Sequence, residues 1–311
     1  MSFSEKKGRF GLIGTITWDT VELASGKKWQ GPGGILYQAA TLCALGFEVS
    51  LICQVGEEIW PKIRTIIKSW PGLITEGIKV VPGLGNQVYL YYPKKGERKE
   101  KLKWAVPPLR FHQIFPVLKS LDFLLVVFNS GFDLDFYTWR QIIKAACCPI
   151  WLDIHSLVLS SNFGDRKYES LETWPAWVDG VNYLQANERE AACLLGRPNK
   201  QLSSKELDLL AQKSLALGLE ALFVTLGKKG VFVATADRGK NLELSEKRQV
   251  VDTTGCGDCL AAATAAKLYQ GESPLEAGRF GLFLASQAAR VKGVASTYRL
   301  IDRLIDNLKK K

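Results

Sequence analysis

Residues 252–258 read Asp-Thr-Thr-Gly-Cys-Gly-Asp and carry the clearest chemical signal of the chain. Gly255 and Gly257 have no side chains, so the backbone can approach a ligand closely and turn its N–H groups toward an anion. The alanine-rich run over residues 259–269 predicts a helix here, with the positive end of its dipole at the same anion. Asp258 would lie in the first turn, within reach of that ligand. An anion site with a carboxylate beside it is what phosphoryl transfer to a hydroxyl group requires.

Asp258 alone also fits a simpler role, because Asp commonly caps the N-terminus of a helix. Other nucleotide-binding signatures are missing from the sequence. The glycines within residues 31–34 do not follow Gly-x-Gly-x-x-Gly, which argues against a dehydrogenase, and residues 227–231 lack the spacing of a P-loop. The segment at residues 252–258 is therefore the leading candidate for a phosphate site.

The composition is that of a globular protein in a reducing compartment. Apolar residues make up 47% of the 311 residues and charged residues 23%, which is enough to bury a full core. The N-terminus carries charges where a signal peptide needs an apolar run, and no stretch is long enough to span a membrane, so we expect a cytoplasmic protein. Seven cysteines, an odd number, suit free thiols, and two histidines are too few for a His-rich zinc site.

The chain carries a net charge of +10, which raises the question of a nucleic-acid partner. The basic residues are spread along the sequence, with local clusters only at residues 94–103 and 309–311. This pattern favours a solvated basic surface and no nucleic-acid partner, because charge balance alone does not define a binding face.

Strands that alternate with helices must position the candidate phosphate site. A buried strand is expected over residues 9–16, ending near Asp19, and Val250 and Val251 are expected to close a strand just before the site. Alternation of this kind predicts a mainly parallel sheet that carries ligands at the carboxyl ends of its strands. The alternation continues with a chain break at 31–34, a helix at 35–45, strands at 49–55, 123–128, 149–153, 183–186 and 221–225, and helices at 137–146, 188–195 and 204–217.

An aromatic and β-branched run at residues 87–92 departs from this alternation. Residues 94–97 then supply a turn, so the region predicts a β-hairpin. Together with residues 20–29 it would form a small separate sheet, and covering a ligand cleft is one use of such a sheet. A hairpin without a function is the alternative.

The segment at residues 252–258 resembles the Asp-Thr-Thr-Gly-Ala-Gly-Asp signature of the pfkB, or ribokinase-like, carbohydrate kinases, with Cys256 in place of alanine. The resemblance extends in order from about residue 9 to residue 298. Further segments that agree with the family pattern are Gly14 to Asp19, Gly33-Gly34 with the following residues 38–40 and 45–46, residues 55–58, Asn187 to Glu190, and residues 224–227 with Gly230.

The family resemblance implies a fold and an activity. The fold is a single three-layer α/β sandwich over residues 1–311, with a mainly parallel central sheet and a small β lid near residues 20–30 and 80–104. The activity is ATP-dependent transfer of the γ-phosphate to a hydroxyl of a sugar or polyol, with Asp258 as the catalytic base. The implied anion hole consists of the backbone amides of Gly255, Cys256 and Gly257.

The resemblance also implies where ligands bind. Acceptor hydroxyls would bind Asp19, with the acceptor lying against the backbone of Gly33 and Gly34 and beside Gln38. Glu190 would bind Mg²⁺ through water, and Asp252 is an optional site for a monovalent cation such as potassium. The nucleotide-binding positions implied by the family are Asn187, Glu190, Thr225, Gly227 and Gly230.

Gln38 departs from the asparagine that sugar kinases of this family usually have, and Tyr37 precedes it. The amide is one methylene longer, so the hydroxyl pattern that it reads can differ. Residues 153–155 resemble the Asp-Pro-Asn stretch beside the substrate only loosely. A nucleoside or vitamin-type acceptor is therefore an alternative, as is a ligand sensor without turnover. A homodimer formed through the small sheet stays open.

Overall fold

The computed structural model describes residues 8–94, 99–161, 163–244 and 250–309. Within these ranges, ten strands form a central sheet that is parallel from β5 to β13, with the last two strands antiparallel at one edge. The order along the sheet is β15-β14-β13-β12-β10-β9-β1-β4-β5, and β6 also pairs with β4. The bounds are β1 Arg9–Ile13, β4 Glu48–Gly56, β5 Leu73–Ile74, β6 Ile78–Val81, β9 Phe123–Val127, β10 Ile150–Asp153, β12 Tyr183–Asn187, β13 Ala221–Thr225, β14 Val231–Ala234 and β15 Gly239–Leu242.

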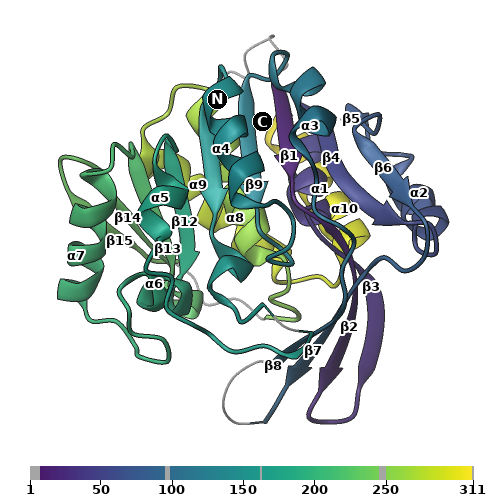
Figure 1. Cartoon of the computed structure of the whole chain (residues 1–311), viewed down its shortest axis with the longest axis horizontal. Helices are drawn as coiled ribbons and strands as arrows, with labels where there is room; N and C mark the ends of the chain where they lie inside the picture. Colours follow the sequence, from purple (N-terminus) through teal and green to yellow (C-terminus); the bar gives the residue numbers. More distant parts are fainter. Residues whose placement is uncertain (1–7, 95–98, 162, 245–249, 310–311) are drawn as a thin grey trace.

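Helices cover both faces of this sheet, which gives three layers (Figure 1). Side chains alternate along the strands, so Leu12 belongs to the core cluster that contains residues of α1, α8, α9 and α10, while Ile13 belongs to the cluster that contains residues of α3 to α7. The expected α/β sandwich with a mainly parallel sheet is therefore confirmed. The bounds are α1 Leu36–Ala44, α2 Trp60–Ile67, α3 Phe111–Leu118, α4 Phe136–Ala145, α5 Trp174–Val178, α6 Glu188–Leu194, α7 Ser204–Leu215, α8 Cys256–Tyr269, α9 Pro274–Ala288 and α10 Val294–Lys309.

A second sheet of five strands projects from one end of the central sheet (Figure 1). Its order is β11-β8-β7-β2-β3, and the β7–β8 hairpin expected from the aromatic run is present. The turn expected within residues 94–97 lies mostly outside the described residues. We call this element the small sheet. Its bounds are β2 Ile16–Leu23, β3 Lys28–Gly34, β7 Asn86–Tyr92, β8 Lys99–Trp104 and β11 Gly164–Asp165.

Three expectations about the strands were wrong. The first strand ends at Ile13, and Asp19 lies in the middle of β2 in the small sheet, because β-branched residues continue across the junction and hide it. The glycine-rich break at residues 31–34 is part of β3, an edge strand, where a proline removes no hydrogen bond from the ladder. The strand expected to end at Val250 and Val251 is absent there, because both residues are irregular and exposed. The N–H groups of Val251 and Asp252 donate hydrogen bonds to the Ala289 carbonyl oxygen.

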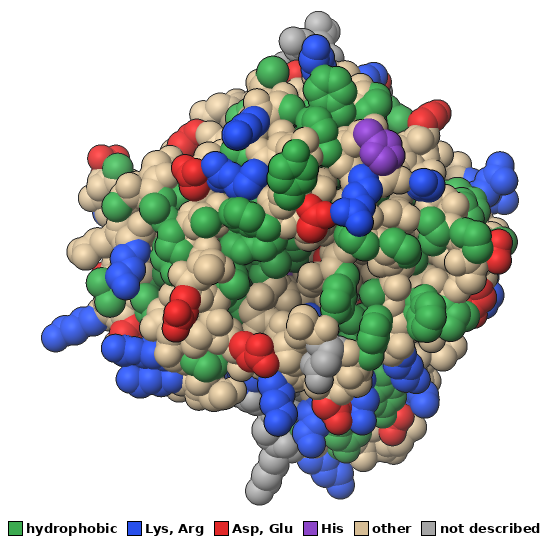
Figure 2. All heavy atoms as spheres, viewed as in Figure 1, with side chains coloured by type: hydrophobic (Ala, Val, Ile, Leu, Met, Phe, Trp, Pro, Cys, Tyr) green, Lys and Arg blue, Asp and Glu red, His purple; other side chains and the backbone are tan. Residues whose placement is uncertain are grey.

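All seven cysteines are free, as the sequence predicts. Among the described residues, none of the helices combines the length and the apolar character needed to cross a bilayer. On the face shown in Figure 2, Lys and Arg side chains are dispersed among acidic and hydrophobic ones, and several extend from the small sheet at the bottom of the view.

Candidate active site

The N-terminus of α8 is built as the sequence predicts. Gly255 is the N-cap with a φ of 77°, and Asp258 lies in the first turn. A Cβ atom at position 255 would lie 2.2 Å from Cγ of Tyr37, so only glycine lets the Tyr37 ring pack against this backbone. Asp252 closes the preceding turn, because its Oδ1 atom accepts a hydrogen bond of 2.9 Å from the Thr254 N–H. The first N–H groups of α8 thus lie in a glycine-defined turn that suits an anion.

A small cavity of about 70 Å³ lies on one side of this turn. Three carboxylates from three different elements face it, and we call it the carboxylate cavity. Asp258 comes from α8, Asp19 from β2 and Glu100 from β8. A helix that covers the central sheet and two strands of the small sheet therefore both contribute. The other lining residues are Thr17, Gly34, Tyr37, Val88, Leu90, Asn129, His155, Thr254 and Gly255.

A larger cavity of about 320 Å³ lies on the other side of the turn, where Thr253, Cys256 and Gly257 line it. Most of its remaining wall is apolar, and we call it the apolar cavity. Thr225, Gly227 and Gly230, expected to border a nucleotide, all line it at the carboxyl end of β13. The other lining residues are Lys228, Leu244, Val250, Leu260, Leu282, Ala285, Ser286 and Ala289.

Asp19 lies against the backbone of β3. Gly33 pairs with Thr17 across the ladder, and a Cβ atom at Gly33 would lie only 2.1 Å from Oδ2 of Asp19. Glycine at this position therefore makes room for the carboxylate of Asp19, a residue that is 9% exposed. The structure thus brings Asp19 and Gly33 together and places Asp19 and Gly34 on the same cavity as Asp258.

Tyr37 is a wall of the carboxylate cavity that sequence reasoning noted only as a neighbour of Gln38. Its ring is 4% exposed, and burial raises the pKa of the hydroxyl far above its usual value, with further increases from Asp19 and Asp252. Tyr37 is therefore a neutral hydrogen-bonding group at any ordinary pH. Gln38 itself is fully buried on α1, and within the described residues neither of its amide atoms has a hydrogen-bond partner.

Asn187 and Glu190 form the N-terminal cap of α6. The Asn187 side chain accepts hydrogen bonds from the Arg189 and Glu190 N–H groups at 2.9 Å. In return, Glu190 Oε2 accepts from the Asn187 N–H at 2.7 Å and Oε1 from the Asn187 side chain at 2.5 Å. This is a reciprocal capping box, so the pair has a structural role, and a metal-binding role stays a prediction.

A buried polar contact below the α8 N-terminus had no signal in the sequence. Gln185, from β12, donates from Nε2 to the Asp153 carboxylate at 2.7 Å and to the Gly257 carbonyl oxygen at 3.3 Å. Burial raises the pKa of Asp153 to about 7, and the Gln185 hydrogen bond opposes that increase. The end of β10 is thereby connected to the first turn of α8.

No group of three or more His, Cys, Asp or Glu side chains in the described residues is arranged to hold a metal ion. Glu190 is 5% exposed, and both of its oxygens already accept hydrogen bonds from Asn187. Mg²⁺ commonly keeps several waters and binds one or two carboxylates together with substrate phosphates. The residues present fit water-mediated contact to such an ion better than direct coordination.

Solved structures of similar shape cover nearly the whole chain. Arabidopsis thaliana ribokinase in complex with ribose and ATP aligns with a TM-score of 0.76 over 96% of this chain and 99% of that chain, at 20% identity. The nucleoside kinase of Methanocaldococcus jannaschii, an archaeal member of the ribokinase family, aligns with a TM-score of 0.71 over 99% of this chain and all of that chain, at 16% identity. The fold is therefore ribokinase-like.

Similarity in sequence covers a smaller part of the chain than similarity in shape. Arabidopsis thaliana ribokinase is 32% identical over 117 residues, which is 37% of this chain and 30% of that protein, so the match spans about a third of the relative. The model of the pfkB family carbohydrate kinases matches residues 147–299, a range that includes the α6 cap, the β13 end and the whole α8 turn. The same residues build the turn between the two cavities, so the resemblance of this part of the chain to the pfkB family of carbohydrate kinases is confirmed.

Proposed function

We propose that the protein is an ATP-dependent phosphotransferase that transfers the γ-phosphate to a hydroxyl group of a sugar or polyol. One observation carries this proposal: the N-terminus of α8 separates two cavities, with Gly255 and Asp258 on one and Cys256 and Gly257 on the other. A phosphoryl group passing between a donor and an acceptor needs an anion site at such a boundary.

The apolar cavity suits the nucleoside part of ATP. Its lining by leucine, valine and alanine side chains offers a non-polar surface, while Thr225, Gly227 and Gly230 border it. The phosphates would then extend toward Gly255, Cys256 and Gly257, whose N–H groups neutralise developing charge. Glu190 and Asn187 support a hydrated Mg²⁺ on those phosphates, and Asp252 is a site for K⁺.

The carboxylate cavity suits the acceptor. Asp19 lies against Gly33, and Gly34 lines the same cavity, so the Asp19 carboxylate and the backbone of β3 together offer acceptors for substrate hydroxyls. Asp258, in the same cavity, removes the proton of the attacking hydroxyl as it bonds to the γ-phosphorus and the bond to the β-γ bridging oxygen breaks. Gln38 is buried on α1, next to Tyr37 in the cavity wall, and would support the acceptor site from that helix.

The small sheet acts as a lid in this proposal. Its Val88 and Leu90 line the carboxylate cavity, and the Tyr92 hydroxyl lies 3.4 Å from Thr254 Oγ1 on the anion turn. Excluding water from this cavity would protect the γ-phosphate from hydrolysis. A single catalytic domain over residues 1–311, a cytoplasmic location and a homodimer through the small sheet are part of the same proposal.

A nucleoside acceptor is the second candidate, and one observation favours it. A neighbouring groove of about 720 Å³ shares Glu100 with the carboxylate cavity and is lined by Tyr89, Tyr91 and Tyr168, which are suited to stacking with a base. The small carboxylate cavity would then hold only the ribose. A ligand sensor remains the non-catalytic alternative.

The test is an ATP-consumption screen of sugars, polyols and nucleosides, with and without K⁺, on the parent protein and Asp258→Asn. Removing a general base typically lowers the rate by about 10²- to 10⁴-fold, so the variant should lose turnover while it keeps ATP binding. Equal turnover by both proteins would reject Asp258 as the base. Ligand binding by the parent without any ATP consumption would favour the sensor.

A further inference from the structure

Glu100 is an acidic side chain of the small sheet that faces the carboxylate cavity, together with Asp19 and Asp258. It lies on β8, about 80 residues from Asp19 and more than 150 from Asp258 in sequence. Its side chain is only 11% exposed. A carboxylate this well buried needs a partner of opposite charge or several hydrogen bonds, because isolated burial of a charge is costly.

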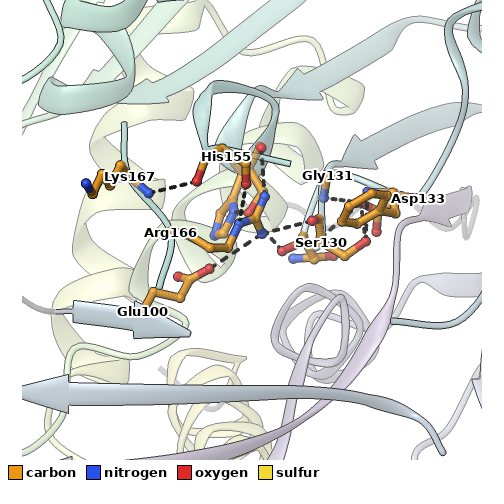
Figure 3. A network of polar contacts seen from close by, with 11 residues as sticks. Glu100, Ser130, Gly131, Asp133, His155, Arg166 and Lys167 are labelled. Carbon is orange, nitrogen blue, oxygen red and sulfur yellow. Dashed lines mark hydrogen bonds and ion pairs between the residues drawn. The ribbon is translucent and has the colours of Figure 1, made fainter. Parts of the chain in front are cut away.

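Arg166 supplies that partner and is itself held rigidly (Figure 3). Its side chain is 1% exposed, and Nη1 lies 3.8 Å from Oε1 of Glu100. The guanidinium also donates to three backbone carbonyls: Nε to Ser160 at 3.1 Å, Nη1 to Ser130 at 2.9 Å and Nη2 to Ser156 at 3.3 Å. The Ser130 and Ser156 carbonyls follow β9 and β10, so the central sheet fixes the cation that faces Glu100.

The loop that supplies the Ser130 carbonyl is held by hydrogen bonds of its own. Asp133 Oδ2 accepts hydrogen bonds of 3.0 Å from the Ser130 N–H, the Ser130 hydroxyl and the Gly131 N–H (Figure 3). Burial lowers the pKa of Arg166, and the nearby Glu100 and Asp133 carboxylates oppose this change. The cation is therefore fixed in position before any acceptor arrives.

A buried ion pair of this kind is poorly explained by stability alone, because apolar residues of similar volume are often as stable. Its position gives a better explanation. The carboxylate group has two oxygens with several acceptor sites, so it can bind a cation and a substrate hydroxyl together. Three carboxylates facing a cavity of about 70 Å³ would also repel a negatively charged group on the acceptor.

We propose that Glu100 binds the acceptor's hydroxyl groups, with Arg166 as its positioning residue, and that it restricts the acceptor to uncharged polyhydroxylated molecules. This inference rests on the proposed kinase function and deepens it. Asp19 binds one part of the acceptor from β2, and Glu100 binds another from β8. Acceptors that carry a phosphate or a carboxylate are rejected by like-charge repulsion.

The experiment compares neutral acceptors (D-ribose, D-fructose and myo-inositol) with anionic ones (D-fructose 6-phosphate and D-gluconate). The parent is expected to use neutral acceptors alone. In Glu100→Gln, the KM for the neutral acceptor should rise about tenfold or more, while kcat and the KM for ATP stay within about twofold. The preference for neutral over anionic acceptors should fall by a similar factor. Asp165→Asn is the matched control, since Asp165 pairs with Lys101 on the same sheet at 3.2 Å and is largely exposed.

Three outcomes would overturn the inference. These are efficient use of D-fructose 6-phosphate or D-gluconate by the parent, an unchanged acceptor KM in Glu100→Gln, and a loss of thermal stability and kcat with no change in selectivity. Calorimetric titration of the same five compounds measures binding without turnover, so the inference is tested even if no acceptor is phosphorylated. The absence of phosphorylation of every acceptor would reject the kinase proposal. Normal turnover by the parent with an unaffected Glu100→Gln variant would reject only the role of Glu100.

Arg166→Lys tests the positioning step. Lysine keeps the charge but loses the planar arrangement of donors that meets three carbonyls. The acceptor KM should rise as in Glu100→Gln, and the double variant should be no worse than either single one, because both changes remove the same contact. Additive effects on KM would mean that Arg166 does not act through Glu100.

Discussion

The two cavities on either side of the α8 turn differ in chemistry. The carboxylate cavity is small and faced by Asp19, Glu100 and Asp258, whereas the described wall of the apolar cavity contains Lys228 as its charged side chain and is otherwise small or apolar. Charged side chains that are fixed by partners read hydroxyl groups, while an apolar surface selects by shape. Under the proposed function, this difference means that selectivity for the acceptor and affinity for the donor would depend on separate parts of the molecule, with the turn as their shared boundary.

The largest effect is expected at that boundary, in Gly255→Ala. The added Cβ would meet the Tyr37 ring at 2.2 Å, and the φ of 77° disfavours any side chain. Displacing an anion-hole N–H typically lowers kcat by about a hundredfold or more. We therefore expect the same loss of kcat whether the donor or the acceptor is varied. Steady-state kinetics with both substrates varied measures this.

Gly271→Ala is the control for Gly255→Ala. Gly271 has a φ of 86°, but nothing lies within 4 Å of the added Cβ. This variant carries the backbone strain without the collision, so it should lose some thermal stability and keep kcat. An equal loss of kcat in both variants would mean that the anion turn has no special part in the rate.

A change confined to the carboxylate cavity should affect the KM for the acceptor and leave the KM for ATP unchanged. In Gly33→Ala, the Cβ would lie 2.1 Å from Asp19 Oδ2 and push the carboxylate aside. We expect a rise of about 10- to 100-fold in the KM for the acceptor and no change in the KM for ATP, because small misplacements of binding groups are costly. Gly31→Ala, on the same strand with open space around its Cβ, should behave like the parent. A parallel rise in the KM for ATP would break the division between the cavities.

The reverse experiment fills the apolar cavity with Ala285→Leu. Ala285 lines this cavity from α9 and is 7% exposed, so a larger side chain takes up space available to the nucleotide. The KM for ATP should rise about tenfold, while acceptor binding measured by calorimetry stays the same. Arg279→Leu places the same side chain on the exposed face of α9 and should leave both constants unchanged. Unaltered ATP binding in Ala285→Leu would mean that the nucleotide lies elsewhere.

The sequence predicts the α8 turn well because its signals are local. Gly255, Gly257 and Asp258 act through backbone freedom and helix position, both of which depend on immediate neighbours. The alternation of strands and helices likewise predicted the centre of the sheet, since β9 and β13 are short apolar runs.

The residues that sequence reasoning missed depend on contacts between distant segments. Glu100 meets the cavity only because β8 pairs with β7, and Arg166 reaches Glu100 because it directly follows β11, which pairs with β8. Gln185 reaches Gly257 across 72 positions. In sequence, Glu100 is one charged residue in a basic run, and nothing near it signals burial. Asp19 was expected at the end of the first strand of the central sheet, and the structure places it within β2 of the small sheet, because only two residues separate β1 from β2.

The smallest effect on activity is expected below the boundary, in Asp153→Asn, where a pH dependence of stability should appear. Burial raises the pKa of Asp153 from 3.8 to about 7 in the folded protein, so the folded state binds more protons than the unfolded state between these values. Stability from this group is complete below the unfolded pKa and is lost as pH rises toward 7.

Between pH 5.5 and 8 the parent should lose about 2 kcal/mol of unfolding free energy relative to Asp153→Asn. Urea unfolding of both proteins at the two pH values measures this, and an equal pH dependence would show that Asp153 is ionised in the fold. In that case the Gln185 contact, which donates to Asp153 and to the Gly257 carbonyl, would hold a charge directly below the turn shared by the two cavities.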